Sequence, residues 1–253
     1  MKGLILAAGR GRRMGKITSN SHKCLVEVHG FKLIDLQISA MLKAGINEIG
    51  IVTGYNSHLL KKDSIIRYFH NENWANTNMV YSLSLAKDWL NQYNCVISYS
   101  DIFYSYSAIE SLLKEESNIS ITYDMNWKSL WGKRFQDPLK DAESFSINKD
   151  SILLSIGKKE RNIEKIKGQF MGLIYFKPKG WHQFEKTLSE MSSKMQKTIS
   201  ITEVFDQIIF SGKETIKAAP YNKIWGEIDS KSDLEIYNSI IPRNDEIFRN
   251  IYK

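Results

Sequence analysis

Residues near the N-terminus combine glycine with positive charge, as phosphate-binding loops do. An apolar run from Leu4 to Ala8 is followed by three glycines and several basic residues: Gly9, Arg10, Gly11, Arg12, Arg13, Gly15, Lys16 and, further on, Lys23. Glycine lets a backbone turn tightly and bring its N–H groups close to an anion, which the basic side chains neutralise. A short apolar run ending at glycine is typical of a buried parallel strand. We therefore expect a nucleotide phosphate site at the carboxyl end of a first strand.

The glycine spacing excludes two widespread phosphate loops. G-x-G-x-x-G fails because position 14 is Met, and the Walker pattern fails because Gly9 would need a glycine at 14 and Gly11 a lysine at 17. Such short patterns specify function loosely. On the residues alone, glycines that serve only turn geometry explain the segment as well as phosphate binding does.

The segment LAAGRGRRM (residues 6–14) followed by HKCL (residues 22–25) resembles the opening of the nucleotidyltransferase family. That family usually reads LAAG-x-G-[ST]-R-M and then Pro-Lys-x-Leu. Arg12 stands where Ser or Thr is usual, and His22 where Pro is usual. The matching residues are Gly9, Gly11, Arg13, Met14, Lys23 and Leu25. The His-Lys-x-Leu form is similar to the phosphocholine cytidylyltransferase branch, which favours CTP.

The resemblance implies transfer of a nucleoside monophosphate from an NTP, here CTP, to a phosphorylated small molecule. It implies nucleotide contacts by Leu6, Ala8, Gly9 and Gly11. Lys23 would contact the α-phosphate or the acceptor phosphate. Arg13 would grip the β- and γ-phosphates with its planar guanidinium, and Arg10, Arg12 and Lys16 are alternates.

Two aspartates are the metal ligands that the resemblance implies, for Mg²⁺ or alternatively Mn²⁺. Asp101 follows the strand expected at 95–98, and Asp229 ends a segment, residues 225–229, that is similar to the family's late Trp-x-x-x-Asp. Glu227 competes with Asp229 because residues two apart face the same side of a strand. Since ligands of an open α/β sheet lie beyond the carboxyl ends of its strands, Asp101 would share an edge with the glycine loop.

Asn78 and Ser82 are the residues expected to read the base. They lie in NTNMVYSL (residues 76–83), which resembles an Asn-rich segment of the cytidylyltransferase branch, and amide and hydroxyl groups can pair with the edge of cytosine. The alternative is that Thr77 or Asn78 caps a helix.

The acceptor pocket is expected in an irregular stretch rich in aromatic and charged residues: Trp127, Trp131, Lys133, Arg134, Asp141 and Glu143. Tryptophans with nearby carboxylates suit a quaternary ammonium group, whereas Lys133 and Arg134 suit an anionic group. An aromatic cluster packed under a loop is the alternative. The resemblance implies L-glutamine phosphate as the preferred acceptor, ahead of phosphocholine and a sugar-1-phosphate.

The composition and charge of the chain argue against a membrane protein and a nucleic-acid-binding protein. The chain has 253 residues, 42% of them hydrophobic, and no apolar run near the ~20 residues that a membrane helix needs. Cys24 and Cys95 have no metal-ligand spacing, which favours a reducing, cytoplasmic setting. The net charge of +7 is spread along the chain without a nucleic-acid motif, so neither nucleic acid nor membrane is an expected partner. Oligomeric state stays open. A nucleotide-sensing module and a basic scaffold are the non-enzyme alternatives.

The apolar patterns predict an α/β fold with a Rossmann-like mixed, mostly parallel sheet flanked by helices, in one domain over 1–253. Strands are expected at 4–8, 49–53, 65–69, 95–98, 119–123, 152–156, 171–176 and 223–229. Helices are expected at 31–44, 79–89, 109–114, 181–191, 202–210 and 234–241. The stretch from Trp127 to Phe145 is expected to be a long loop or a β-excursion off the main sheet, and the resemblance implies that it folds over the acceptor site.

Overall fold

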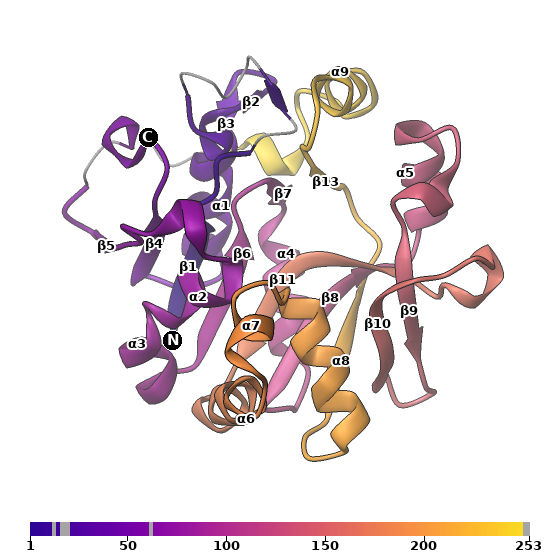
Figure 1. Ribbon diagram of the computed structural model, residues 1–253. Coiled ribbons are helices and arrows are strands. Elements are labelled where there is room, and N and C mark those ends of the chain that lie inside the picture. The colour runs from indigo at the N-terminus through magenta and orange to yellow at the C-terminus, as the bar shows by residue number, and fades with distance from the viewer. Residues whose placement is uncertain (12–13, 16–20, 61–62, 250–253) are drawn as a thin grey trace.

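The described residues form a seven-stranded sheet in which one strand runs against the others (Figure 1). The computed structural model describes residues 1–11, 14–15, 21–60 and 63–249. In spatial order the strands are β12 (Ile216–Tyr221), β8 (Ile119–Asp124), β11 (Gln169–Phe176), β6 (Cys95–Tyr99), β1 (Lys2–Ala7), β4 (Ile49–Thr53) and β5 (Ile66–His70). Only β11 is antiparallel to its neighbours. The expected mixed, mostly parallel sheet is confirmed.

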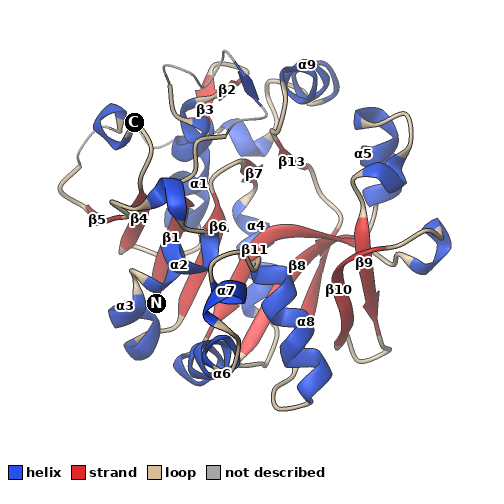
Figure 2. Ribbon diagram, in the orientation of Figure 1, coloured by secondary structure: helices blue, strands red, loops and turns tan. Residues whose placement is uncertain are grey.

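Helices cover the sheet in two groups (Figure 2). The helices α1 (Leu33–Lys43) and α4 (Tyr106–Leu113) pack together, and α3 (Lys87–Gln92), α6 (Pro178–Ser189) and α8 (Ile201–Ser211) form the second group. All six residues of β1 are buried, as expected of a central parallel strand with both faces covered.

The stretch 127–145, expected to be a long loop or a β-excursion, contains strand only from residue 143 on. There β9 (Glu143–Ile147) forms a hairpin with β10 (Leu153–Lys159), close to the strand expected at 152–156, and β10 packs against α8. A helix, α5 (Trp127–Arg134), precedes it where no helix was predicted. The prediction missed α5 because only one narrow stripe of this helix is apolar: Trp127 and Trp131 are the residues that it buries.

Two further predictions needed correction. The helix predicted at 79–89 is interrupted after Ser84, so that α2 (Met79–Ser84) and α3 are separate; in α3, Trp89 packs edge-on against Phe69 of β5. The strand predicted at 223–229 is only β13 (Trp225–Glu227). It pairs with β7 (Ile102–Tyr104), apart from the main sheet. One edge of the main sheet is instead β12, a strand that was not predicted.

The C-terminal part of the described chain returns to its beginning. The helix α9 (Lys231–Ile240) lies beside the two-stranded ladder of β2 (Glu27–Val28) and β3 (Phe31–Lys32) in Figure 1. Tyr237 and Phe248 share a hydrophobic cluster with Val28 and Leu33. A short helix, α7 (Ser193–Gln196), links α6 to α8. Within the described ranges, no helix has both the length and the apolar character needed to cross a bilayer.

Candidate active site

His22 lies against the end of β1. Its Nε2 donates to the carbonyl oxygen of Ala7 at 2.7 Å, and its Nδ1 accepts from the backbone N–H of Cys24. The side chain is fully buried, and this burial lowers the pKa of His22 despite the hydrogen bond to Ala7, so the imidazole is neutral. His22 therefore ties the short helix that begins at Lys23 to the end of the first strand.

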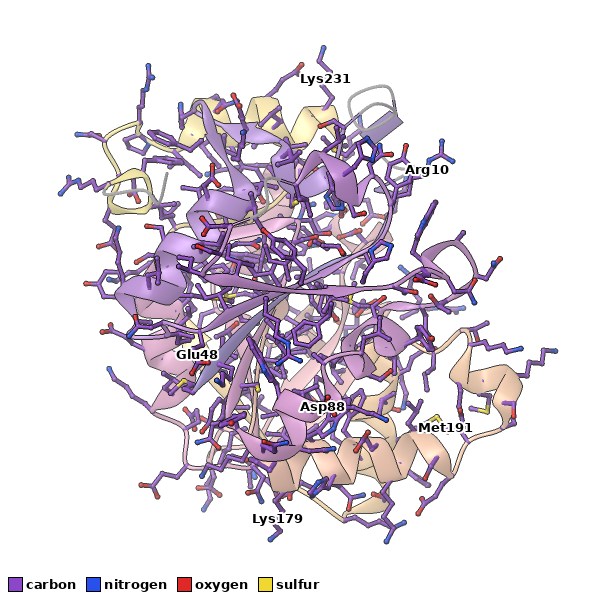
Figure 3. All side chains as sticks on the ribbon, turned by 90° about the vertical axis from the view of Figure 1, so that its left-hand side faces the viewer. Arg10, Glu48, Asp88, Lys179, Met191 and Lys231 are labelled. Carbon is purple, nitrogen blue, oxygen red and sulfur yellow. The ribbon has the colours of Figure 1, made fainter. Side chains whose placement is uncertain are left out.

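Glycines make room for close backbone approach at this edge. Gly11 has φ of +65°, and a Cβ there would lie 3.0 Å from the Lys23 side chain. A Cβ on Gly54, just after β4, would lie 2.6 Å from the Ala8 carbonyl oxygen. Arg10 reaches out at the surface (Figure 3), with its guanidinium 5.5 Å from the ring of Tyr55.

Only some of the other residues that were expected to contact the nucleotide lie in the described part of the chain. Leu6 and Ala8 are buried, and Gly9 is exposed. The expected phosphate contact Arg13, with its alternates Arg12 and Lys16, lies outside the described residues.

Three carboxylates gather at the carboxyl edge of the sheet. Ligand atoms of Asp101, Glu227 and Asp229 lie within 4.8 Å of one another. The β7–β13 ladder brings them together, because the Ile228 N–H donates to the Asp101 carbonyl oxygen at 2.9 Å. The buried amide of Gln37 donates to the carbonyl oxygens of Tyr99 and Ile102 on either side of Asp101.

Lys23 joins the loop to this cluster. Its Nζ donates to Asp101 and to Asp229, at 2.7 Å in each case, and only 9% of its side chain is exposed. Burial acts to lower the pKa of Lys23, but the two carboxylates outweigh it and raise the pKa above its ordinary value. The ammonium group therefore stays charged between the expected nucleotide loop and the expected metal ligands.

The carboxylates fit a divalent cation. Oxygen ligands from two or more carboxylates are what Mg²⁺ and Mn²⁺ prefer. The Oδ1 atom of Asp101 is buried and makes no hydrogen bond within the described residues. Burial, and then repulsion from Asp229 and Asp101, raises the pKa of Glu227 to about 8, as expected where negative charge is in excess. A bound dication would give the Asp101 Oδ1 atom a partner and would offset the excess negative charge around Glu227.

Lys133 and Arg134 do not form the pocket for an anionic acceptor that was expected from the sequence. The Arg134 side chain has no exposed surface; its Nε donates to Asp233 at 2.8 Å and its Nη1 to Glu227 at 3.3 Å. Lys133 is exposed and lines a separate cavity with Asp124 and Lys223. The two side chains point in different directions from the end of α5. They therefore do not form one anion-binding pocket together.

Asn78 and Ser82 are engaged within the protein. Asn78 caps α2 by accepting from the Tyr81 N–H, while its amide donates to the carbonyl oxygens of Gln196 and Ile199. Ser82 is buried and donates to the Asn78 carbonyl oxygen. The helix-cap alternative thus describes Asn78, and these three hydrogen bonds leave the base-reading role without support in this geometry.

A cavity of about 300 Å³ opens beside the carboxylates. Aromatic rings of Tyr99, Trp131 and Phe170 line it, and Trp131 donates its Nε1–H to Asp141 at 3.0 Å. Among the described residues around this cavity there is no lysine or arginine, whereas four are acidic: Asp141, Glu143, Glu227 and Asp229. Sequence reasoning assigned Trp131, Asp141 and Glu143 to one pocket. It missed Phe170 and Gln169, which come from the antiparallel strand β11.

A glycine loop after the first strand, a buried lysine and a carboxylate cluster at one sheet edge define a nucleotidyltransferase-type site. The model of the MobA-like NTP transferase domain matches residues 3–139. The chain is 33% identical to CTP:phosphoglutamine cytidylyltransferase of Campylobacter jejuni over 254 residues, 93% of this chain and 98% of that protein. The chain therefore belongs to the MobA-like NTP transferase family and is a nucleotidyltransferase.

Two further similarities agree with this family. Choline-phosphate cytidylyltransferase of Haemophilus influenzae is 36% identical over 105 residues, which are 40% of this chain and 44% of that protein. The solved structure of the inositol-1-phosphate CTP transferase from T. maritima has a TM-score of 0.71 at 18% identity, covering 94% of this chain and 95% of the other. The resemblance to the cytidylyltransferase branch and the fold are thus confirmed.

Proposed function

We propose that the protein transfers CMP from CTP to a phosphorylated small molecule and releases pyrophosphate, with L-glutamine phosphate as the preferred acceptor. This reaction would run in the cytoplasm and would serve capsule phosphoramidate synthesis. Support for the nucleotide comes from the cytidylyltransferase relatives. Phosphocholine is the second candidate acceptor and a sugar-1-phosphate the third.

The charge of the cavity supports an acceptor that carries an ammonium group. Asp141 and Glu143 line it, no lysine or arginine lines its described part, and the Glu143 carboxylate forms no hydrogen bond within the described residues. Asp141 is half-buried and Glu143 is exposed, and a nearby cation favours the charged form of such carboxylates. Glutamine phosphate and phosphocholine both bring a positively charged nitrogen, whereas a neutral sugar does not.

The transfer needs positioning and charge neutralisation more than proton transfer, because an ionised acceptor phosphate is already a nucleophile. Lys23 would neutralise charge on the α-phosphate as the acceptor oxygen attacks and pyrophosphate leaves. The Gly9–Gly11 loop would offer its backbone to the leaving phosphates. Asp101, Glu227 and Asp229 would hold Mg²⁺, or alternatively Mn²⁺, which when bound supplies further neutralisation of phosphate charge.

The decisive experiment measures pyrophosphate release with Mg²⁺, crossing CTP, UTP, ATP and GTP against glutamine phosphate, phosphocholine, phosphoethanolamine and glucose-1-phosphate. Release only with CTP and glutamine phosphate is the expected result. Release with CTP and phosphocholine would assign the cavity to a quaternary ammonium instead. Binding of CTP without release from any pair would favour a nucleotide-sensing module.

A Glu143→Gln variant tests the charge argument. It keeps the size of the side chain and removes its charge, so the KM for an ammonium-bearing acceptor should rise by roughly tenfold, the equivalent of one lost charge-assisted contact, while the KM for CTP stays unchanged. The exposed Lys158, which pairs with Asp206, supplies a neighbouring control as Lys158→Gln. An acceptor KM equal to that of the unmodified protein would contradict an ammonium contact at Glu143.

A further inference from the structure

The site contains a cation that no substrate can reach. The Arg134 side chain is completely buried at the end of α5 and faces three carboxylates with its three nitrogens. Nε lies 2.8 Å from Asp233, Nη1 lies 3.3 Å from Glu227, and Nη2 lies 3.8 Å from Asp229. Two of these carboxylates belong to the expected metal cluster. Burial acts to lower the pKa of Arg134, but its interactions with Tyr237, Asp233 and Glu227 outweigh this and raise the pKa, so the guanidinium is charged.

Asp233 extends this contact to the backbone of the cluster. While its Oδ1 accepts from Arg134, its Oδ2 accepts from the N–H groups of Asp229 and Ser230, at 3.0 and 2.8 Å. The same oxygen completes the capping box with Ser230 that begins α9. One aspartate thus connects α5, the start of α9 and the chain that carries Asp229.

We propose that Arg134 is a positioning residue, which orients Glu227 by direct contact and Asp229 through Asp233 so that both can hold a divalent cation. The inference rests on the metal site of the proposed function. It assigns no contact between Arg134 and either substrate.

The planar guanidinium suits this task better than an ammonium group would. Its N–H groups point in fixed directions, so one side chain can address several carboxylates at once, whereas lysine provides a single point charge. Partners behind metal ligands fix the orientation of those ligands. The same helix carries Trp131, whose Nε1–H holds Asp141 of the acceptor cavity. Side chains of α5 therefore contact both an expected metal ligand and a residue of the expected acceptor cavity.

The test compares Arg134→Lys with Lys128→Arg, a reverse exchange on the same helix. Lys128 is partly exposed and pairs with Glu164, away from the cluster. Mn²⁺ binding to the free protein is measured by electron paramagnetic resonance. The Kd for Mn²⁺ should rise about 10- to 100-fold in Arg134→Lys, the usual cost of losing such a partner, and stay unchanged in Lys128→Arg. An unchanged Kd in Arg134→Lys would overturn the inference.

A kinetic measurement separates positioning from general damage to the fold. If Arg134 only orients the ligands, high Mg²⁺ should restore most of the kcat of Arg134→Lys, because ligand atoms are still present. It should not restore Asp229→Asn, which lacks a charged ligand. A kcat of Arg134→Lys that stays low at saturating Mg²⁺ would contradict a role through metal positioning.

The unmodified protein keeps the inference testable if the variant fails to fold. The Nε–H proton of Arg134 should exchange slowly with solvent, and its nitrogen resonance should shift when Mg²⁺ is added. No shift, in a protein that binds Mn²⁺, would overturn the inference and leave the proposed function intact. Failure of the unmodified protein to bind Mn²⁺ would instead reject the metal site itself.

Discussion

Lys23 is the residue that connects the two halves of the site, since its ammonium group reaches Asp101 and Asp229 from the loop after β1. A charge placed between the nucleotide and the acceptor is worth most in the transition state, where phosphate charge is redistributed. In Lys23→Met, kcat should fall roughly 10²- to 10³-fold, as for loss of one preorganised donor, with a much smaller rise in the KM for CTP.

Steady-state kinetics with CTP and the accepted substrate checks this expectation. Because Lys23 shares its carboxylates with the expected metal, the Mn²⁺ affinity of free Lys23→Met should be equal to or higher than that of the unmodified protein. That result also shows that the variant folds. Equal losses in kcat and in CTP affinity would contradict a transition-state role.

Glu227 gives the site a pH dependence. Since burial and the neighbouring aspartates raise its pKa to about 8, the free protein carries a proton on Glu227 below that pH. A metal ion binds the ionised carboxylate, so the proton must leave. Metal affinity should therefore fall as pH drops below about 8, by up to tenfold per unit.

Titration calorimetry with Mn²⁺ between pH 6 and 9 measures this dependence through both the Kd and the protons released. The effect of pH on folding stability has the opposite sign. Because the pKa of Glu227 is raised in the folded state, its contribution to the free energy of unfolding is present at low pH and is lost as pH rises from the unfolded-state pKa through the folded-state pKa. Glu227→Gln should remove the pH dependence of metal binding. Its persistence in that variant would assign the titration to another group.

Residue type and the place of a residue relative to a strand predicted some neighbours in the site but not all of them. Asp101 was expected at this edge because it follows an apolar strand, and Asp229 because its segment is similar to the family's Trp-x-x-x-Asp, with Glu227 as its competitor; the β7–β13 ladder brings all three together. Arg134 has the charge of an anion-binding residue, but its place on α5 turns it toward buried carboxylates. Residue type gives no information on which way a helix faces.

At the scale of elements, glycines at two positions should respond in opposite ways to an added methyl group. Gly132 lies inside α5, and a Cβ there meets nothing within 4 Å. Gly132→Ala should stabilise the protein by up to about 1 kcal/mol, the difference in helix propensity. In Gly54→Ala the methyl group would meet the Ala8 carbonyl oxygen at 2.6 Å, so β1 and the segment after β4 must separate.

Chemical denaturation with CTP titration distinguishes the two variants. Gly54→Ala should lose stability and bind CTP more weakly, because Ala8 precedes the glycine loop. Gly132→Ala should raise the denaturation midpoint and leave CTP binding unchanged. A destabilised Gly132→Ala would mean that α5 is strained at this position, contrary to the open space around it.

Elements were predictable where apolar residues alternate clearly with polar ones or form a continuous run. The strands β1, β4 and β6 lie where apolar runs predicted them, because central parallel strands bury both faces. The strand β12 escaped notice because Lys217 and Pro220 interrupt its apolar run, a pattern that an edge strand tolerates. The helix α5 escaped because its packing depends on two tryptophans rather than on a full apolar face.

At the scale of the whole molecule, the two hydrophobic clusters each join distant parts of the chain. One extends from Leu4 in β1 to Trp225 in β13, and the other from Met14 to Phe248. Leu130 of α5 packs against both. We therefore expect residues 1–253 to unfold as one cooperative unit, since no described segment has a core of its own that excludes the others.

Differential scanning calorimetry tests this expectation. The calorimetric and van't Hoff enthalpies should agree, as they do for a two-state transition. Because the site draws on β1, β7, α5 and the residues after β13, ligand binding should stabilise the entire chain. CTP with Mg²⁺ at a hundred times its Kd should add about 2.7 kcal/mol to the free energy of unfolding and move the single transition upward. Two transitions, of which CTP moves only one, would show that the nucleotide loop belongs to a separate folding unit, and the site would then form at an interface between two units.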